Sequence, residues 1–353
     1  MNNPDAPLTG IASARADGAS SRAAVRYLQV MVAVTAAMLV PFIVWGVVGK
    51  DHFAAIPRGD DPSWYRNYDD GTTRSIQDRD VFYHNIGHSI DNARAADIIV
   101  LGHSMVLWGL RDDQLVEFGR KHGVKIFNMA SAGDGSGEFL RLVIERWQLH
   151  PKLWIINADD HAANFFSVSL DDFGNSGGSA ANVVVKYSRL HGFFNVVGRN
   201  LRWRLEDFIA DTLPAPIAKV FLTTVSALHV HRSVVDGNWD LQTVPAYNAT
   251  NPYTTLTRDQ NCPATPAELG VARSYVAEIG GSTILTLFPY NGSCPQRVKE
   301  IAAALGLETI IPPDVHYTTT DQAHLDKRGA TEFTAFFLAA LEQTEAFRKI
   351  APR

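Results

Sequence analysis

The sequence predicts an α/β fold with helices on both faces of a mostly parallel sheet, a three-layer α/β/α arrangement, preceded by one transmembrane helix. Three observations predict it. Short apolar runs rich in β-branched residues recur after residue 96, and stretches of helical length separate them. Near the N-terminus lies an uncharged stretch, 27–49. A chain of 353 residues is long enough to bury one large core.

The uncharged stretch 27–49 would form a helix roughly 34 Å long, which is enough to cross a bilayer. Arg15, Arg22 and Arg26 precede it, so the positive-inside rule places a disordered tail, 1–26, in the cytoplasm. A cleaved signal peptide is the alternative, but the stretch exceeds a usual signal-peptide core and no small-x-small cleavage site follows. We therefore expect a single-pass inner-membrane protein whose main domain lies in the periplasm or otherwise outside the cytoplasm.

After a juxtamembrane segment, 50–95, with a short helix over 81–95, we expect the α/β domain to occupy 96–353. Its strands are expected at 97–101, 124–128, 153–157, 283–288 and 308–311. Its helices are expected at 112–121, 137–149, 266–279, 295–305 and 328–347. An insertion at about 165–262 breaks the alternation and is too long for a simple loop. Within it, 182–210 is expected to form a basic amphipathic helix, packed on its own domain or alternatively on the membrane or over the mouth of the site.

Composition excludes several classes of function. A net charge of -5 and a pI near 6.2 give no basic surface for nucleic acid. Two cysteines are too few for a cysteine-based zinc framework. Cys262 and Cys294 are expected at the same edge of the sheet, where they can form a disulfide, and two free thiols are the alternative. His84 and His88 would share a helix face, but they lack the glutamate of a zinc protease, so we expect neither a metal nor a cofactor.

Ser104 follows the first strand of the domain, where open α/β sheets place their chemistry, although a helix-capping serine is the alternative. Near the C-terminus, Asp321 and His324 are three residues apart, so a turn can place the carboxylate against one imidazole nitrogen while the other faces the cleft. A serine hydroxyl requires such a base, and the base requires an acid to orient it. Asp314 and His316 form a rival acid and base pair in a loop.

With these residues the chain resembles the SGNH (GDSL-like) hydrolases, which have a three-layer α/β/α fold and are recognised by short sequence blocks. Gly-His-Ser at 102–104 resembles the first block, with His103 where the family usually has Asp. The stretch 128–133, which ends at Gly133, resembles the second block. Asp321, His324, Leu325 and Gly329 resemble the last and most specific block.

The third family block, Gly-x-Asn-Asp, corresponds here to Asn157-Ala158-Asp159-Asp160. Asp159 therefore stands where the family has an asparagine that helps to bind the oxyanion. Because a carboxylate repels an oxyanion, the donor is Asn157 or Asn164, or is missing. His103, Asp159 and Asp160 are thus expected to modulate the reaction.

The resemblance implies that Ser104 attacks an ester carbonyl, His324 acts as base and then acid, and Asp321 orients His324. Backbone N–H groups of Ser104 and Gly133 would hold the oxyanion. The expected activity is that of a serine esterase or an O-acyltransferase acting on O-acyl, in particular O-acetyl, groups of an envelope polysaccharide. The expected partners are this acylated carbohydrate, the membrane and a membrane-bound acyltransferase. The alternatives are a catalytically weakened SGNH fold that binds polymer or such an acyltransferase, and a lipase or general carboxylesterase.

Overall fold

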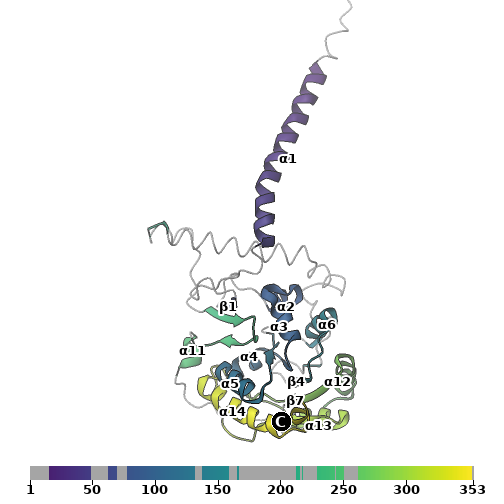
Figure 1. Ribbon diagram of the computed structural model, residues 1–353, viewed down its shortest axis with the longest axis vertical. Coiled ribbons are helices and arrows are strands. Elements are labelled where there is room, and N and C mark those ends of the chain that lie inside the picture. Colours follow the sequence, from purple (N-terminus) through teal and green to yellow (C-terminus); the bar gives the residue numbers. More distant parts are fainter. Residues whose placement is uncertain are drawn as a thin grey trace, which may run out of the picture. The chain divides into compact units, whose positions relative to one another are not determined.

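The computed structural model describes residues 16–48, 63–69, 78–131, 137–158, 165–166, 212–214, 217, 229–242, 244–249 and 261–351. Its main sheet has five strands in the order β3-β2-β4-β7-β8, and every neighbouring pair is parallel. Figure 1 labels β4 and β7 of this sheet. These strands are β2 (Ile98–Leu101), β3 (Ile126–Asn128), β4 (Leu153–Asn157), β7 (Ser282–Thr286) and β8 (Glu308–Ile310). All five expected strands are therefore present, each within a few residues of its predicted bounds.

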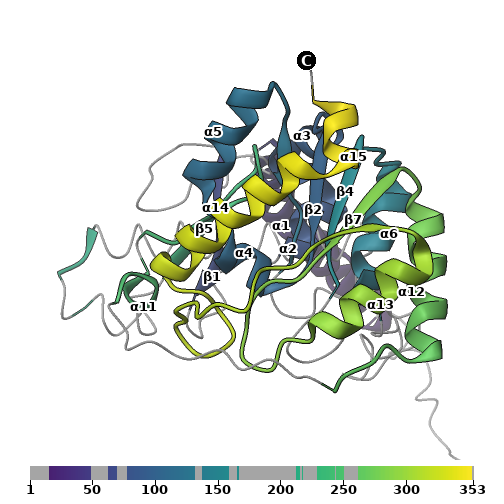
Figure 2. The ribbon, with the colours of Figure 1, turned by 90° about the horizontal axis from the view of Figure 1, so that it is seen from below.

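Helices pack on both faces of this sheet, as Figure 2 shows for α4, α5 and α14 on one side and α6, α12 and α13 on the other. The helices of the first layer are α4 (Ser104–Gly109), α5 (Asp112–His122), α14 (Lys327–Gln343) and α15 (Glu345–Ile350). Those of the second are α2 (Asp78–His84), α3 (Ser89–Arg94), α6 (Gly137–Trp147), α12 (Pro266–Ile279) and α13 (Pro295–Leu305). The predicted three-layer α/β arrangement is thus confirmed.

Side chains that alternate between the two faces of the main sheet form two buried apolar clusters, one on each face. In β2, Ile98 and Val100 join one buried cluster, whereas Ile99 and Leu101 join the other. Successive side chains of a strand point to opposite faces, so a run that is buried throughout indicates a strand covered on both sides. This explains why the apolar runs of the sequence predicted the parallel sheet correctly.

A second, antiparallel sheet was not predicted. Its order is β1-β5-β6, formed by β1 (Trp64–Asp69), β5 (His229–Ser233) and β6 (Trp239–Asp240), with the short helix α11 (Pro245–Asn248) following. The segment expected to lie between membrane and domain supplies β1, and the insertion supplies β5 and β6. Both segments are therefore built into the domain.

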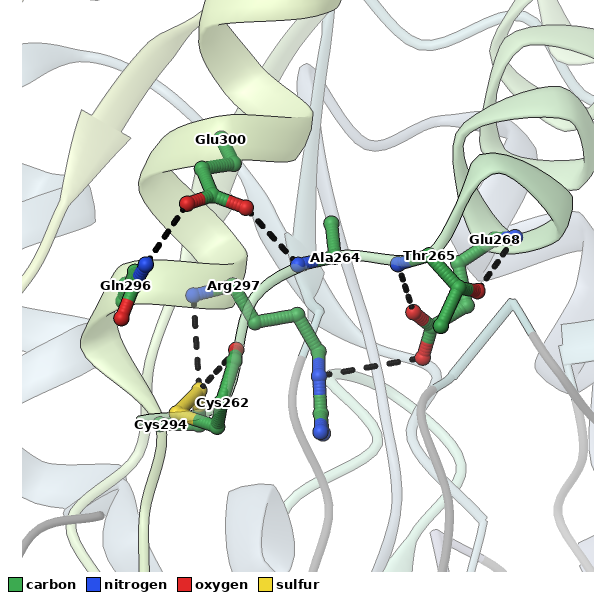
Figure 3. Close-up of a disulfide and its surroundings, with 8 residues drawn as sticks. All are labelled: Cys262, Ala264, Thr265, Glu268, Cys294, Gln296, Arg297 and Glu300. Carbon is green, nitrogen blue, oxygen red and sulfur yellow. Dashed lines mark hydrogen bonds and ion pairs between the residues drawn. A yellow bond between two sulfur atoms is a disulfide. The ribbon is translucent and has the colours of Figure 1, made fainter. Parts of the chain in front are cut away.

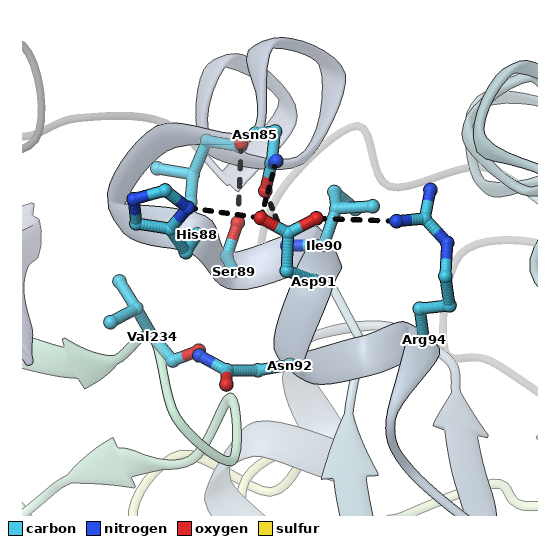
Figure 4. Close-up of polar contacts among 9 residues, drawn as sticks. Asn85, His88, Ser89, Ile90, Asp91, Asn92, Arg94 and Val234 are labelled. Carbon is cyan, nitrogen blue, oxygen red and sulfur yellow. Dashed lines mark hydrogen bonds and ion pairs between the residues drawn. The ribbon is translucent and has the colours of Figure 1, made fainter.

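The prediction of one continuous helix over 81–95 is wrong. Asn85 and Gly87 adopt positive φ angles of 51° and 60°, which end α2 and leave a one-turn 3-10 helix, η1 (Ile86–His88), before α3. His84 and His88 consequently do not share a face of one helix. Instead, Nδ1 of His88 lies 2.9 Å from Oδ2 of Asp91 (Figure 4).

The two cysteines form a disulfide, with their Cα atoms 6.1 Å apart (Figure 3). Cys262 precedes α12, and Cys294 is the residue before the first turn of α13. The capping box of α12, in which Thr265 and Glu268 exchange hydrogen bonds, fixes the helix start beside the bridge. The structure thus decides the alternative that the sequence left open.

The N-terminal helix α1 spans Ala16–Val48 and includes most of the stretch 27–49. Among the residues that the structure describes, no helix meets the length and apolarity required to cross a membrane. The predicted amphipathic helix at 182–210 lies outside the described residues.

Candidate active site

The strand order places a crevice between β2 and β4. Along the chain, β2 is the first strand of this sheet, and its neighbours β3 and β4 lie on opposite sides of it. In doubly wound sheets, ligands bind beyond the carboxyl ends of the strands where the strand order reverses in this way. Ser104 follows β2 and Asn157 ends β4, so both lie at this position. Topology alone thus directs attention to the predicted nucleophile.

Ser104 is the first residue of α4, and it is not the cap of that helix. His103 occupies the N-cap position and makes no side-chain capping bond, whereas Oγ of Ser104 lies 2.8 Å from Nε2 of His324. Gly102, two residues before Ser104, has a φ of 159°, and a Cβ there would clash with Val106 and lie 3.0 Å from Cβ of Asn157. A glycine is required for the chain to turn this tightly out of β2.

His324 and Asp321 complete a triad with the serine. Nδ1 of His324 lies 2.7 Å from Oδ2 of Asp321, while Oδ1 of Asp321 accepts from the backbone N–H groups of His324 at 2.8 Å and Ala323 at 3.0 Å. The carboxylate therefore fixes both the ring and the turn that carries it. The side chain of His324 is 22% exposed and that of Asp321 53% exposed, so the histidine is reachable from solvent.

The turn that carries this pair is closed on itself. Thr319 and Leu325 form an antiparallel bridge, and the N–H of Thr320 donates to the carbonyl of His324 at 2.8 Å. Asp326 then caps α14 by accepting from the N–H of Gly329 at 2.8 Å. The histidine is consequently held by a defined turn at the start of a long helix.

Thr334 connects α14 to α4. Thr334 of α14 donates through Oγ1 to the carbonyl of Gly109 at 3.0 Å, and the N–H of Arg111 donates back to the same Oγ1 at 3.0 Å. Gly109 ends α4, the helix that begins with Ser104. This contact explains how residues 220 positions apart in the sequence come within hydrogen-bond distance.

The electrostatics of the pair favour an ionised acid. Partial burial raises the pKa of Asp321, but the hydrogen bond and charge of His324, with the two backbone N–H groups, outweigh it and hold that pKa well below its usual range. A permanent carboxylate keeps the proton of the neutral imidazole on Nδ1. Nε2 is then free to accept the proton of Ser104.

The predicted oxyanion donors are only partly described. Asn157 is fully buried, and its Oδ1 accepts from the N–H of Phe288 at 3.1 Å, linking the ends of β4 and β7. Its role as a donor to the oxyanion stays a prediction. Gly133, Asn164, Asp159 and Asp160 lie outside the described residues.

The surroundings of the triad include His103, which was expected at the site from the sequence, and Trp108, which was not. His103 is buried, with its ring edge-to-face against Phe165 at 5.8 Å. The ring of Trp108 lies 5.3 Å from that of His324. No sequence signal distinguished Trp108, because its position four residues after Ser104 has meaning only once α4 faces the histidine turn.

The insertion also contacts Asn128, the first residue of the stretch that resembles the second family block. Arg232 of β5 is fully buried and donates from Nη2 to the carbonyl of Asn128 at 2.7 Å, while its Nη1 lies 2.6 Å from Oδ1 of Asp78. The N–H of Asn128 donates to the carbonyl of Asp236 at 2.7 Å. The strand end that leads toward Gly133 is thus held by the insertion.

No group of three or more His, Cys, Asp or Glu side chains is placed to hold a metal ion in the part of the chain that the structure describes. The rival residues Asp314 and His316 are both exposed. The chemistry that the described geometry supports is nucleophilic, with Ser104, His324 and Asp321 in line.

In comparisons with known proteins, no family model, curated protein or solved structure matches this chain.

Proposed function

We propose that this protein is a serine esterase or O-acyltransferase that acts on O-acyl groups, in particular O-acetyl groups, of an envelope polysaccharide. The observation that carries the proposal is the chain of two short contacts, 2.8 Å from Ser104 to His324 and 2.7 Å from His324 to Asp321. The order of the triad residues and the sequence blocks around them resemble the SGNH hydrolases. The disulfide between Cys262 and Cys294 supports a domain that works outside the cytoplasm.

In the proposed reaction, His324 removes the proton of Ser104 as Oγ attacks the ester carbonyl. The imidazolium that forms is stabilised by Asp321 and then protonates the departing alcohol, which leaves an acyl-serine. A second nucleophile, deprotonated by the same histidine, releases the acyl group. Water as that nucleophile completes a hydrolysis, whereas a sugar hydroxyl completes a transfer.

A fluorophosphonate probe tests the nucleophile directly. We expect the full-length protein to be labelled on Ser104 and the labelling to disappear in Ser104→Ala and to fall sharply in His324→Ala. Ser293, which is buried, provides the matched control, because Ser293→Ala should be labelled like the wild type. An unlabelled but folded wild type would contradict the enzyme proposal and favour a polymer-binding role.

Product analysis separates the two reactions. The protein is incubated with an acetylated oligosaccharide, and in parallel with p-nitrophenyl acetate and a bare oligosaccharide. Free acetate alone identifies an esterase, and an acetylated sugar identifies a transferase. A strong preference for long-chain p-nitrophenyl esters over the acetate would contradict the proposal and indicate a lipase.

A further inference from the structure

A cavity of about 140 Å³ lies beside the proposed active site, and its described walls come from the second sheet and from the helices α5 and α11. The start of α5 forms one wall, and the segment from β6 to α11 forms the other, with Trp64 of β1 at the side. Its lining residues are Trp64, Leu110, Arg111, Asp112, Asp113, Trp239, Asp240, Leu241, Gln242 and Tyr247. Crossover helices run antiparallel to their strands, so the start of α5 lies at the carboxyl edge of the sheet, as Ser104 does.

A single tryptophan connects the cavity with the triad. The ring of Trp108 lies 5.3 Å from that of His324, 5.9 Å from that of Tyr247 and 6.4 Å from that of Trp239. Trp239 and Tyr247 are buried in the same apolar cluster as Leu325, the neighbour of His324. Two rings that line the cavity therefore pack against the same tryptophan as the triad histidine does.

The lining combines rings with planar polar groups. Trp64 is partly exposed and Gln242 exposed, while Trp239 and Tyr247 are buried behind them. Carboxylate and amide groups can satisfy several hydroxyls at once, and an aromatic face accepts the C–H side of a sugar ring. With room for several water molecules, the cavity matches one sugar residue rather than an extended chain.

The charge of the lining narrows the kind of sugar. Among the described lining residues Arg111 is the only basic one, and its guanidinium donates two hydrogen bonds to Asp113, from Nε at 3.0 Å and from Nη2 at 2.7 Å. Asp112 and Asp240 add further carboxyl groups, and the described part of the lining contains no second cation. A uronic acid or another anionic sugar would therefore meet repulsion, whereas a neutral or amine-bearing sugar would not.

We propose that this cavity is a subsite that binds one neutral or amine-bearing sugar residue of the polysaccharide and thereby presents a neighbouring O-acyl group to Ser104. The subsite rests on the proposed function, and it adds the charge class of the substrate. Trp64 supplies the ring platform, and Gln242 and the carboxyl groups receive the hydroxyls.

Binding is measured on the full-length Ser104→Ala protein by saturation-transfer NMR and titration with three probes, namely cellopentaose, glucosamine pentamer and a guluronate pentamer. We expect the first or second probe to bind and the guluronate oligomer to bind at least tenfold more weakly. In the same background, Trp64→Ala and Gln242→Ala should each raise the Kd at least tenfold, and Trp64→Phe should restore most of the affinity.

Gln296→Ala, at an exposed glutamine of α13 far along the chain, is the matched control and should leave the Kd unchanged. In proteins with Ser104 intact, the ratio of activity on acetylated cellopentaose to activity on p-nitrophenyl acetate should fall at least tenfold in Trp64→Ala. Tighter binding of the guluronate oligomer, or binding indifferent to both Trp64 and Gln242, would overturn the subsite. Hydrolysis of p-nitrophenyl acetate depends on the triad and not on the subsite. A wild-type protein that does not hydrolyse this ester would therefore refute the proposed function rather than the subsite.

Discussion

Arg232 donates a hydrogen bond from Nη2 to the main-chain carbonyl of Asn128 at 2.7 Å, and so joins the insertion to the strand end beside the proposed nucleophile. The same guanidinium pairs with Asp78 at 2.6 Å, contributes Nε to the carbonyl of Gly237 at 2.8 Å and lies 4.8 Å from the ring centre of Phe82. A single buried cation thus connects the second sheet, helix α2 and the main sheet.

Removal of this cation should destabilise the whole domain. Arg232→Met leaves the carboxylate of Asp78 buried with the hydroxyl of Tyr65 but without its cationic partner, and breaking a buried pair of this kind costs about 3–5 kcal/mol. Urea unfolding measures the loss, and adding Asp78→Leu to Arg232→Met should recover part of it. Arg328→Met removes an exposed ion pair with Glu332 and should change the free energy of unfolding little. An equally small effect of Arg232→Met would show that the buried pair does not hold the insertion.

Asp321→Asn should lower kcat on p-nitrophenyl acetate by a factor on the order of 10³–10⁴, because an amide no longer fixes the imidazole tautomer. Combining it with Ser104→Ala should add little to the loss from the serine variant, since the triad acts as a unit. Asp314→Asn is the matched control and should retain near wild-type kcat. A large loss in Asp314→Asn would instead favour the rival pair with His316.

Gly102→Ala should reduce the same activity strongly while leaving the protein folded. Its Cβ would clash with Val106 and crowd Asn157, so the turn that delivers Ser104 must shift, and displacements of about 1 Å cost on the order of 100-fold in rate. Gly270→Ala lies inside α12 with no atom within 4 Å of the added Cβ, and should raise the free energy of unfolding by about 0.5–1 kcal/mol. Steady-state kinetics and urea unfolding distinguish the two effects.

Reduction of the disulfide should lower the free energy of unfolding by roughly 3–4 kcal/mol, as expected for a closed loop of this length. The sequence separation of the two cysteines is 32 residues. Thermal unfolding with and without dithiothreitol measures the change. A Cys262→Ser/Cys294→Ser variant should be as unstable as the reduced protein and insensitive to dithiothreitol. An identical Tm for the wild type in both conditions would contradict a structural role of the bridge.

Asp112 should make stability fall as the pH rises. Burial, with the nearby charge of Asp236, raises the pKa of Asp112 to about 6, so the folded protein binds this proton more readily than the unfolded chain does. The contribution of Asp112 to the free energy of unfolding is therefore fully present below about pH 4 and is lost as the pH rises from about 4 to 6. Asp112→Asn should flatten that slope and raise the free energy of unfolding at pH 8 by about 1 kcal/mol, after discounting for partial exposure. Urea unfolding at pH 4 and 8 checks this, and an unchanged slope would contradict it.

Local patterns carried the predictions that proved correct. Apolar runs such as Leu153–Asn157 predicted strands correctly, because both faces of a buried parallel strand are apolar. The spacing of Asp321 and His324 predicted their contact, since a turn of three residues is a local structure. By contrast, the positive φ of Asn85 broke the helix predicted over 81–95 without a strong sequence signal.

The sequence by itself determined the parallel sheet, the triad residues and the two cysteines that could pair, because period, spacing and residue chemistry are properties of neighbouring positions. The tertiary structure decided the second sheet, the clamp of Arg232 on Asn128 and the cavity beside Trp108. The register of Trp64 against Ser233 joins segments far apart in the chain, and it depends on packing energy summed over the whole core rather than on any local preference.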